Sequence, residues 1–172
     1  TPVSQTLSLK VGNDDPSQDT PPSYDAGEGS GLAVDVAGRV HVLAPQRGVV
    51  ASWLPGEDVE TVEIPEGWPT STAGDAGSAV QVAAVGGDLV ALDAAGGRIL
   101  LPSGVEGVPQ DTSARLQQSG GDADVVLVAS KSGLIGYPLG GGAPEVILDG
   151  LAADRVASPI RVGACFHGAF VT

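Results

Sequence analysis

The feature that most constrains the fold is a pattern of short apolar runs separated by glycine-containing turns, which recurs along the chain. It occurs as GLAVDVAGRVHVLAPQRGVVASWLP over residues 31–55 and as SAVQVAAVGGDLVALDAAGGRILLP over residues 78–102. A third copy is ARLQQSGGDADVVLVASKSGLIGYPL over residues 114–139, and a fourth copy begins at Ser158. Each complete copy is typical of three strands joined by two turns. The chain is therefore predicted to repeat one supersecondary unit.

The spacing of the copies indicates which repeat fold they form. Intervals of 49, 36 and 40 residues separate the equivalent positions Arg39, Asp88, Asp124 and Ala164. Propeller blades recur at roughly 40 to 50 residues. The middle run of each copy is almost continuously apolar, as expected for a strand that stacked blades cover on both faces. We therefore predict an all-β fold of about four β-propeller repeat units, as an open arc or as part of a larger propeller. A β-sandwich stays an alternative because it also has short strands with turns about every 8 to 12 residues.

The whole chain, 1–172, is expected to form one propeller-like domain or fragment. Its units are predicted at approximately 31–66, 78–109, 114–148 and 157–172. In the first and third units we also expect a fourth strand, at Val59–Ile64 and Glu145–Leu148. Residues 1–12 alternate Leu7, Leu9 and Val11 and are predicted to be a strand of a preceding unit, whereas residues 13–30 are predicted to be an exposed loop.

Composition narrows the possible partners and the possible helix content. The 26 glycines and 13 prolines leave little room for helices. A net charge of −13 disfavours nucleic acid as a partner, because phosphates would be repelled. No apolar run approaches the roughly 18 residues of a membrane span, so we expect no membrane insertion of these residues. The absence of methionine, with strand patterns at both ends, is expected of a piece of a longer protein.

The sequence predicts no catalytic, cofactor or metal site. Only two histidines are present, His41 and His167, which are fewer ligands than zinc sites normally use. No GxSxG motif occurs, and the paired glycines are interpreted as turn residues because none precedes the Lys-Ser/Thr of a phosphate-binding loop. His41 is interpreted as a polar residue that faces a channel or a neighbouring blade. Trp68, between Gly67 and Pro69, is expected to be more exposed than Trp53 and is a candidate ligand contact, although packing across a blade edge is the stronger interpretation.

The turns DVAGRV and LDAAGGRILL resemble those of quinoprotein, NHL and WD40-like propeller repeats. The segments LQQSGGDADVVLVASKSGLIGYPLGGGAPEVIL and PIRVGACFHGAFVT resemble, more narrowly, the propeller region of large bacterial envelope proteins that carry immunoglobulin-like or fibronectin type III domains. The resemblance covers about residues 31–172. It implies an anchored, outward-facing, non-enzymatic module located at the cell envelope. It also implies that Cys165, the single cysteine, forms a disulfide with a cysteine outside this chain, whereas the residues alone favour a buried structural thiol.

We therefore predict a non-catalytic scaffold or interaction module of a larger extracellular bacterial protein, with a protein or glycan as its ligand. A propeller enzyme of the lactonase, lyase or quinoprotein kind is the first alternative. Asp35 and Arg161 are the nearest polar candidates on the inner strands for such a site. A carbohydrate-binding module is the second alternative, disfavoured by the scarcity of aromatic residues. Self-association is expected through the exposed edges of the terminal strands, Thr6–Val11 and Cys165–Val171.

Overall fold

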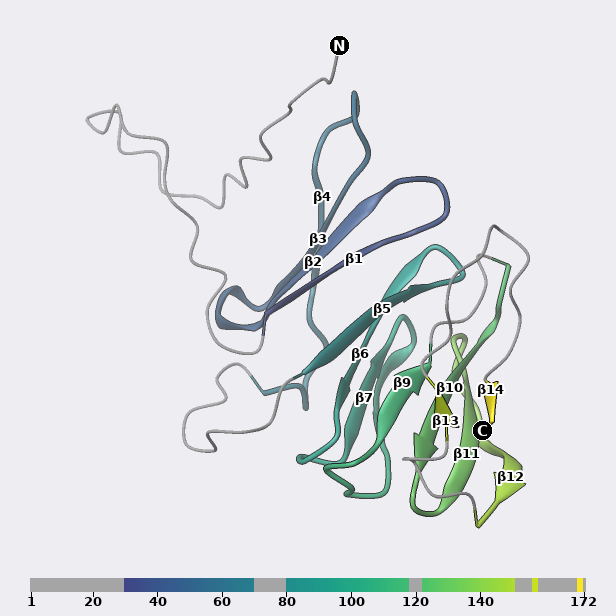
Figure 1. Cartoon of the computed structure of the whole chain (residues 1–172). Helices are drawn as coiled ribbons and strands as arrows, with labels where there is room; N and C mark the ends of the chain where they lie inside the picture. Colours follow the sequence, from purple (N-terminus) through teal and green to yellow (C-terminus); the bar gives the residue numbers. More distant parts are fainter. Residues whose placement is uncertain (1–29, 70–79, 118–121, 151–155, 158–169, 172) are drawn as a thin grey trace.

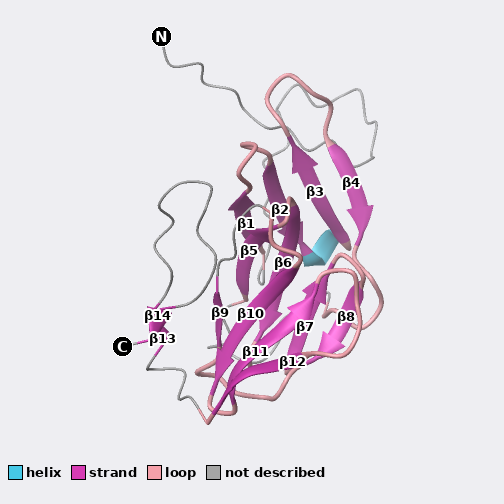
Figure 2. Ribbon diagram, turned by 90° about the vertical axis from the view of Figure 1, so that its right-hand side faces the viewer, coloured by secondary structure: helices cyan, strands magenta, loops and turns pink. Residues whose placement is uncertain are grey.

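A computed structural model describes residues 30–69, 80–117, 122–150, 156–157 and 170–171. These residues form three four-stranded antiparallel sheets and one two-stranded sheet (Figure 1). The one helical element among them is a single 3-10 turn, Pro45–Arg47 (Figure 2). It begins with proline, whose missing N–H would have no partner at the start of a helix. The predicted all-β fold is confirmed.

Each four-stranded sheet takes its strands in chain order, which is the order of a propeller blade. Blade 1 contains β1 (Gly31–Val34), β2 (Val40–Ala44), β3 (Val49–Trp53) and β4 (Glu60–Glu63). Blade 2 contains β5 (Gln81–Val85), β6 (Asp88–Asp93), β7 (Arg98–Leu101) and β8 (Gly104–Gly107). Blade 3 contains β9 (Arg115–Gln117), β10 (Val125–Ser130), β11 (Gly133–Pro138) and β12 (Glu145–Asp149).

The three blades lie side by side as an arc. The first strands of successive blades contact one another, β1 with β5 and β5 with β9, so these strands form the inner side of the arc (Figure 1). The last strands, β4, β8 and β12, are the outer strands. This arrangement is that of propeller blades in sequence, and it excludes a sandwich of two facing sheets for the described residues.

Two predictions for the beginning of the chain lie outside the described residues. These are the strand expected within 1–12 and, apart from Ser30, the loop expected within 13–30. Of the fourth unit, the structure describes β13 (Val156–Ala157) and β14 (Phe170–Val171), which pair antiparallel. The fourth strand of blade 2, β8, has no counterpart among the predicted strands, since its sequence Gly-Val-Glu-Gly has low strand propensity.

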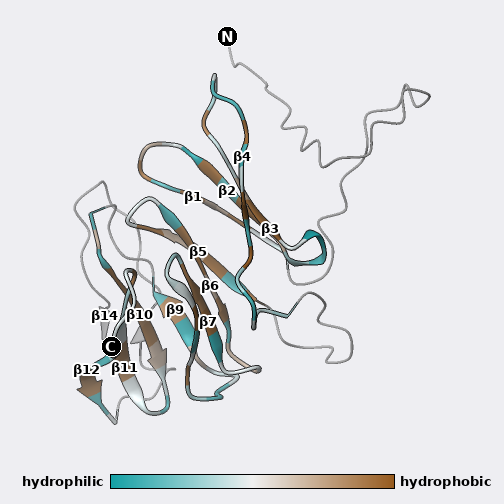
Figure 3. Cartoon of the chain, turned by 180° about the vertical axis from the view of Figure 1, so that it is seen from behind, coloured by the Kyte–Doolittle hydropathy of each residue, from teal (hydrophilic) through white to brown (hydrophobic). Residues whose placement is uncertain are grey.

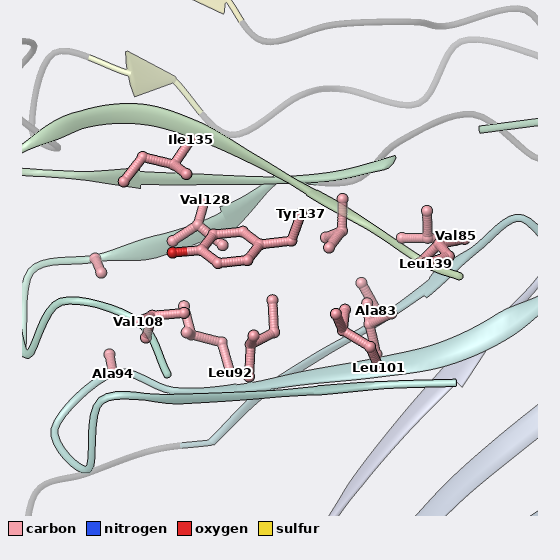
Figure 4. Close-up of a cluster of buried hydrophobic side chains, with 14 residues drawn as sticks. Ala83, Val85, Leu92, Ala94, Leu101, Val108, Val128, Ile135, Tyr137 and Leu139 are labelled. Atoms are coloured by element: carbon pink, nitrogen blue, oxygen red, sulfur yellow. The ribbon is translucent and has the colours of Figure 1, made fainter. Parts of the chain in front are cut away.

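Aliphatic clusters between the blades hold the arc together. The larger cluster lies between blades 2 and 3 and includes Leu92, Ile99, Val126 and Tyr137 (Figure 4). A second cluster joins blades 1 and 2 through Leu43, Trp68, Leu89 and Leu100, with Val50 and Val82 packed against it. Hydrophobic stretches accordingly follow the strands (Figure 3).

Each blade has two faces. We call the face on the side of the preceding blade the leading face, and the face on the side of the following blade the trailing face. In blade 1 the trailing face packs on blade 2.

The predicted tight turn of blade 2 is confirmed and shows why glycine is required there. Gly86 and Gly87 link β5 to β6 with φ angles of 60° and 90°, and Val85 pairs directly with Asp88. Two consecutive positive φ angles define the two-residue hairpin turn that matches strand twist. The turn fixes the register, and therefore which side chains of β5 and β6 face each neighbouring blade.

Candidate functional site

A chain of three polar side chains crosses blade 1 on its trailing face. His41 on β2 lies directly opposite Ser52 on β3, and its Nδ1 is 2.8 Å from the Ser52 hydroxyl oxygen. Its Nε2 is 3.6 Å from a carboxylate oxygen of Asp35, which follows β1. His41 is 3% exposed and Asp35 is 9% exposed. The structure thus brings together a carboxylate, an imidazole and a hydroxyl from three successive segments of blade 1.

The surroundings of this chain indicate a bracing role. The second oxygen of Asp35 accepts hydrogen bonds from the backbone N–H groups of Ala37 and Arg39, at 2.9 and 2.8 Å, and so closes the turn between β1 and β2. Ser52 lies within β3, a strand that is hydrogen-bonded on both sides, rather than at a sharp strand-to-helix turn. The three side chains therefore tie together two strands and a turn next to blade 2.

The carboxylate of Asp93 braces a turn of blade 2 in the same manner. Asp93 accepts a hydrogen bond from the Gly96 N–H at 2.8 Å and lies 3.7 Å from the Arg98 guanidinium. The sequences DVAGR and DAAGGR are alike, yet Asp35 closes the turn between β1 and β2, whereas Asp93 closes the turn between β6 and β7. The motif is therefore a turn signature that occurs at two different places in a blade.

Asp111 couples blade 2 to blade 3. It lies in the connection between β8 and β9, where it accepts hydrogen bonds from the hydroxyl and N–H of Ser113 at 2.6 and 2.9 Å. The Lys131 N–H, in the turn between β10 and β11, donates a third hydrogen bond at 2.7 Å. The Ser113 hydroxyl, followed by the Lys131 N–H, lowers the pKa of Asp111 from 3.8 to about 2, although burial opposes this. The ionised carboxylate is thus part of the fold.

A glutamine forms a similar link on the inner side of the arc. Gln81, the first residue of β5, donates from Nε2 to the Ala114 carbonyl and accepts the Leu116 N–H at Oε1, both at 2.8 Å. Its side chain therefore joins the inner strand of blade 2 to the backbone of the inner strand of blade 3. The sequence analysis did not single out Gln81, Asp111 or Ser52, because the role of each depends on a partner in another strand or connection.

The structure corrects the expectation for the tryptophans. Trp68 is 5% exposed and packs in the cluster between blades 1 and 2. The loop that carries it is held by a hydrogen bond from Arg98 to the Gly67 carbonyl at 3.0 Å. Trp53 is half-buried and is therefore the more exposed of the two. Trp68 packs between the blades, which agrees with the stronger of the two interpretations, whereas the expectation that it is the more exposed tryptophan is wrong.

The remaining sequence candidates fall into two groups. His41 faces blade 2, since it shares its face of the sheet with Leu43, a member of the cluster between the blades. Cys165, His167 and Arg161 lie outside the described residues.

No group of three or more His, Cys, Asp or Glu side chains suited to a metal occurs in the described part of the chain. Nor does that part contain a helix long and apolar enough to span a membrane.

The leading face of blade 1 is apolar, and none of the described strands covers it. Leu32 and Val34 of β1 are 61% and 45% exposed. The second residues of β5 and β9, Val82 and Leu116, instead pack against the clusters between blades. The half-buried pair Val40 and Trp53 also lies on this face, opposite one another on β2 and β3.

Blade 3 shows how such a face is normally covered. Its cross-strand pair Val126 and Tyr137, which corresponds to Val40 and Trp53, is 0% and 1% exposed against blade 2. Burial raises the pKa of Tyr137, with a smaller contribution from the charge of Glu106. The leading face of blade 1 therefore has the composition of an interface between blades, without a blade upon it among the described residues.

Comparison with known proteins adds a fold-level likeness only. No protein-family model and no curated protein matches the sequence. The chain is similar to the solved structure of selenomethionine-substituted virginiamycin B lyase from Staphylococcus aureus, at 14% identity and a TM-score of 0.38. The similarity covers 67% of this chain and 40% of the lyase chain, so this chain spans less than half of that protein. The fold assignment rests on the sheets themselves: the chain is an arc of β-propeller blades.

Proposed function

We propose that this chain is a non-catalytic β-propeller module that serves as a scaffold or interaction platform in a larger extracellular bacterial protein. The observation that carries the proposal is the open leading face of blade 1, on which Leu32 and Val34 are 61% and 45% exposed, next to Val36 in the following turn, which is 49% exposed. Contiguous exposed apolar side chains on a folded protein mark sites of association. The face contains no charged residue on β1, β2 or β3, and Glu63 of the outer strand β4, which pairs with Val49, is the charged residue at its rim. Its centre therefore suits the aliphatic surface of a partner protein rather than a charged or sugar ligand.

The polar residues support the same proposal. Asp35, Asp93 and Asp111 each accept hydrogen bonds from turn N–H groups, which leaves them braced rather than poised to move a proton. His41 is buried against blade 2, so a substrate would have to part the blades to reach it. A propeller enzyme is the second candidate, favoured by the contacts from Asp35 through His41 to Ser52.

The interaction role is tested by photocrosslinking in the source cells. A benzoylphenylalanine in place of Leu32 is expected to crosslink to a protein segment identified by mass spectrometry. The matched control is the same group in place of Glu66, an exposed residue in the loop after blade 1. Crosslinks at position 32 but not at position 66 support a docking face. Equal yields at both positions, or none at either, contradict it.

Two further measurements address location and catalysis. A membrane-impermeant amine reagent applied to intact cells is expected to label Lys131, whose side chain is 74% exposed. Lack of labelling until the cells are broken would argue against an extracellular module. Turnover of an ester, lactone or glycoside panel is expected to be absent. Activity that disappears in Ser52→Ala and His41→Ala would favour the propeller enzyme instead.

A further inference from the structure

The outer strand of blade 3, β12, presents an apolar run at the edge of its sheet (Figure 3). Three successive residues, Val146, Ile147 and Leu148, are 58%, 46% and 43% exposed. Only β11 pairs with β12 among the described strands, so its other edge carries backbone N–H and C=O groups without a strand beside them. An edge of this kind is a template on which a further strand can be added.

The exposure of these side chains belongs to the outer position in a blade rather than to a missing neighbour. Val146 lies opposite Ile135, which packs in the cluster against blade 2, yet Val146 remains largely exposed. Blade 1 shows the same relation, because Val62 of β4 lies opposite Val50, which packs against the cluster shared with blade 2, and is 68% exposed. Outer strands therefore extend beyond the neighbouring blade.

The other two outer strands are less suited to receive a further strand. In β4 the sequence is Glu-Thr-Val-Glu, with one apolar residue between charges. In β8 the sequence is Gly-Val-Glu-Gly, and its single apolar residue, Val105, packs against the cluster between blades 1 and 2. Charges and short length are the usual means by which an edge strand avoids pairing. Of the three outer strands, β12 alone has an uncharged middle of three apolar residues.

The ends of β12 indicate the charge of the strand that would pair with it. Glu145 and Asp149 bracket the apolar run and are exposed, and neither has an ion-pair partner in the described part of the chain. Glu60 of β4, by contrast, lies 3.5 Å from the Arg39 guanidinium. Opposite charges that face one another across two strands stabilise their pairing. A strand added to β12 should therefore carry a cation near each end.

The same charges argue against a second copy of this chain as the partner. If two β12 strands pair antiparallel and in register, Glu145 faces Asp149 at both ends. If they pair parallel and in register, each carboxylate faces its own equivalent. Like charges directly opposite one another destabilise a strand pair. The outer strands β4 and β8 also carry glutamate and no lysine or arginine, so they are no better as partners.

We propose that β12 binds, by strand addition, a short extended segment of a partner protein that has an apolar centre and a lysine or arginine at each end. Backbone hydrogen bonds hold the added segment, and the apolar residues and terminal carboxylates of β12 select it. The bulge at Ile147 increases the local twist of the strand, so a short segment fits best. This edge is separate from the leading face of blade 1, from which it is two blades away (Figure 1).

Amide-resolved hydrogen exchange by NMR on the full chain tests the proposal with the peptide acetyl-Lys-Val-Thr-Val-Lys-amide. Some amides of residues 145–149 are expected to exchange fast in the free chain, because they point away from β11. Millimolar peptide should slow these amides at least about threefold, because they gain backbone acceptors. The acidic peptide acetyl-Glu-Val-Thr-Val-Glu-amide should bind about tenfold more weakly, since two attractive pairs become repulsive.

Charge reversal on the protein provides the matched control. Glu145→Lys with Asp149→Lys should reverse the preference, so that the acidic peptide binds more tightly. Glu66→Lys with Asp122→Lys changes the net charge equally at exposed residues outside β12 and should keep the original preference. Leu32→Asp with Val34→Asp should leave peptide binding unchanged, so a failure of the docking face on blade 1 is distinguishable from a failure here.

Three results would overturn the proposal. The first is that every amide of residues 145–149 already exchanges slowly in the free chain, which would mean that the edge is covered. The second is that the amides become protected as the protein concentration rises without peptide, which would make a second copy the partner. The third is that the basic peptide has no effect on these amides, or that charge reversal on β12 leaves the preference between the peptides unchanged.

Discussion

Blade 1 and blade 2 have similar sequence patterns but differ in how far their second strands are buried. Every residue of β6 after Asp88 is buried, whereas in β2 the leading-face residues Val40 and Val42 are only half-buried. Blade 2 has a neighbour on both faces, and the described part of blade 1 has a neighbour only on its trailing face. A continuous apolar run therefore indicates a strand suited to cover on both sides. The apolar side chains that blade 1 leaves exposed on its leading face have the pattern of an interface that another β-structure would complete.

The largest expected effect comes from emptying the core of the middle blade. Leu92 is 0% exposed in the cluster between blades 2 and 3. Leu92→Ala should lower the free energy of unfolding by about 3 kcal/mol, since it removes buried methylenes and leaves a cavity. Leu32→Ala, on the open face, should stay within about 0.5 kcal/mol of the parent chain. Urea denaturation measures both, and similar losses would show that the two blades are equally covered in solution.

The polar chain of blade 1 gives the next effect. Blade 2 has Val90 where blade 1 has His41, as both residues pair with an alanine of the inner strand. His41→Ala should cost about 2 kcal/mol, because it opens a cavity and leaves Ser52 and Asp35 without their imidazole partner. Ser52→Ala should cost about 1 kcal/mol, and the double variant less than the sum. Strict additivity would contradict coupling between the two side chains.

The sequence predicted the strands better than the contacts between them. The apolar runs placed eleven of the twelve blade strands, and β8 escaped because two of its four residues are glycine. Trp68 was misjudged because its neighbours Gly67 and Pro69 are typical of an exposed loop, yet Arg98 holds that loop against the core. The meeting of Asp35, His41 and Ser52 depends on register, which turn geometry decides, and so could not be predicted from spacing alone.

The connection between blades 2 and 3 is expected to respond to acid. The pKa of Asp111 is lowered from 3.8 to about 2 in the folded chain, so its carboxylate stabilises the fold above pH 3.8. That contribution is lost as the pH falls toward 2 and the carboxylate is protonated. Asp111→Asn should cost about 1 kcal/mol at neutral pH, because one acceptor is replaced by a donor.

The acid dependence distinguishes this role from simple packing. The difference in unfolding free energy between the parent chain and Asp111→Asn should shrink from pH 3.8 to about 2, where the parent also loses its carboxylate. Denaturation curves at several pH values measure this difference. A gap that stays constant over that interval would mean that Asp111 contributes through its shape rather than its charge.

The smallest expected effect is also the sharpest test of the open face. In the double variant Leu32→Asp and Val34→Asp, both new carboxylates enter water, so the free energy of unfolding should change by no more than about 0.5 kcal/mol. In blade 3, Leu116→Asp places a carboxylate against the cluster shared with blade 2 and should cost about 2 kcal/mol, because the partly buried Leu116 leaves the new charge incompletely hydrated. Binding of an apolar dye should fall in the double variant, since its surface site is lost. If the double variant instead unfolds like Leu116→Asp, the leading face of blade 1 is covered within this chain and cannot be its docking surface.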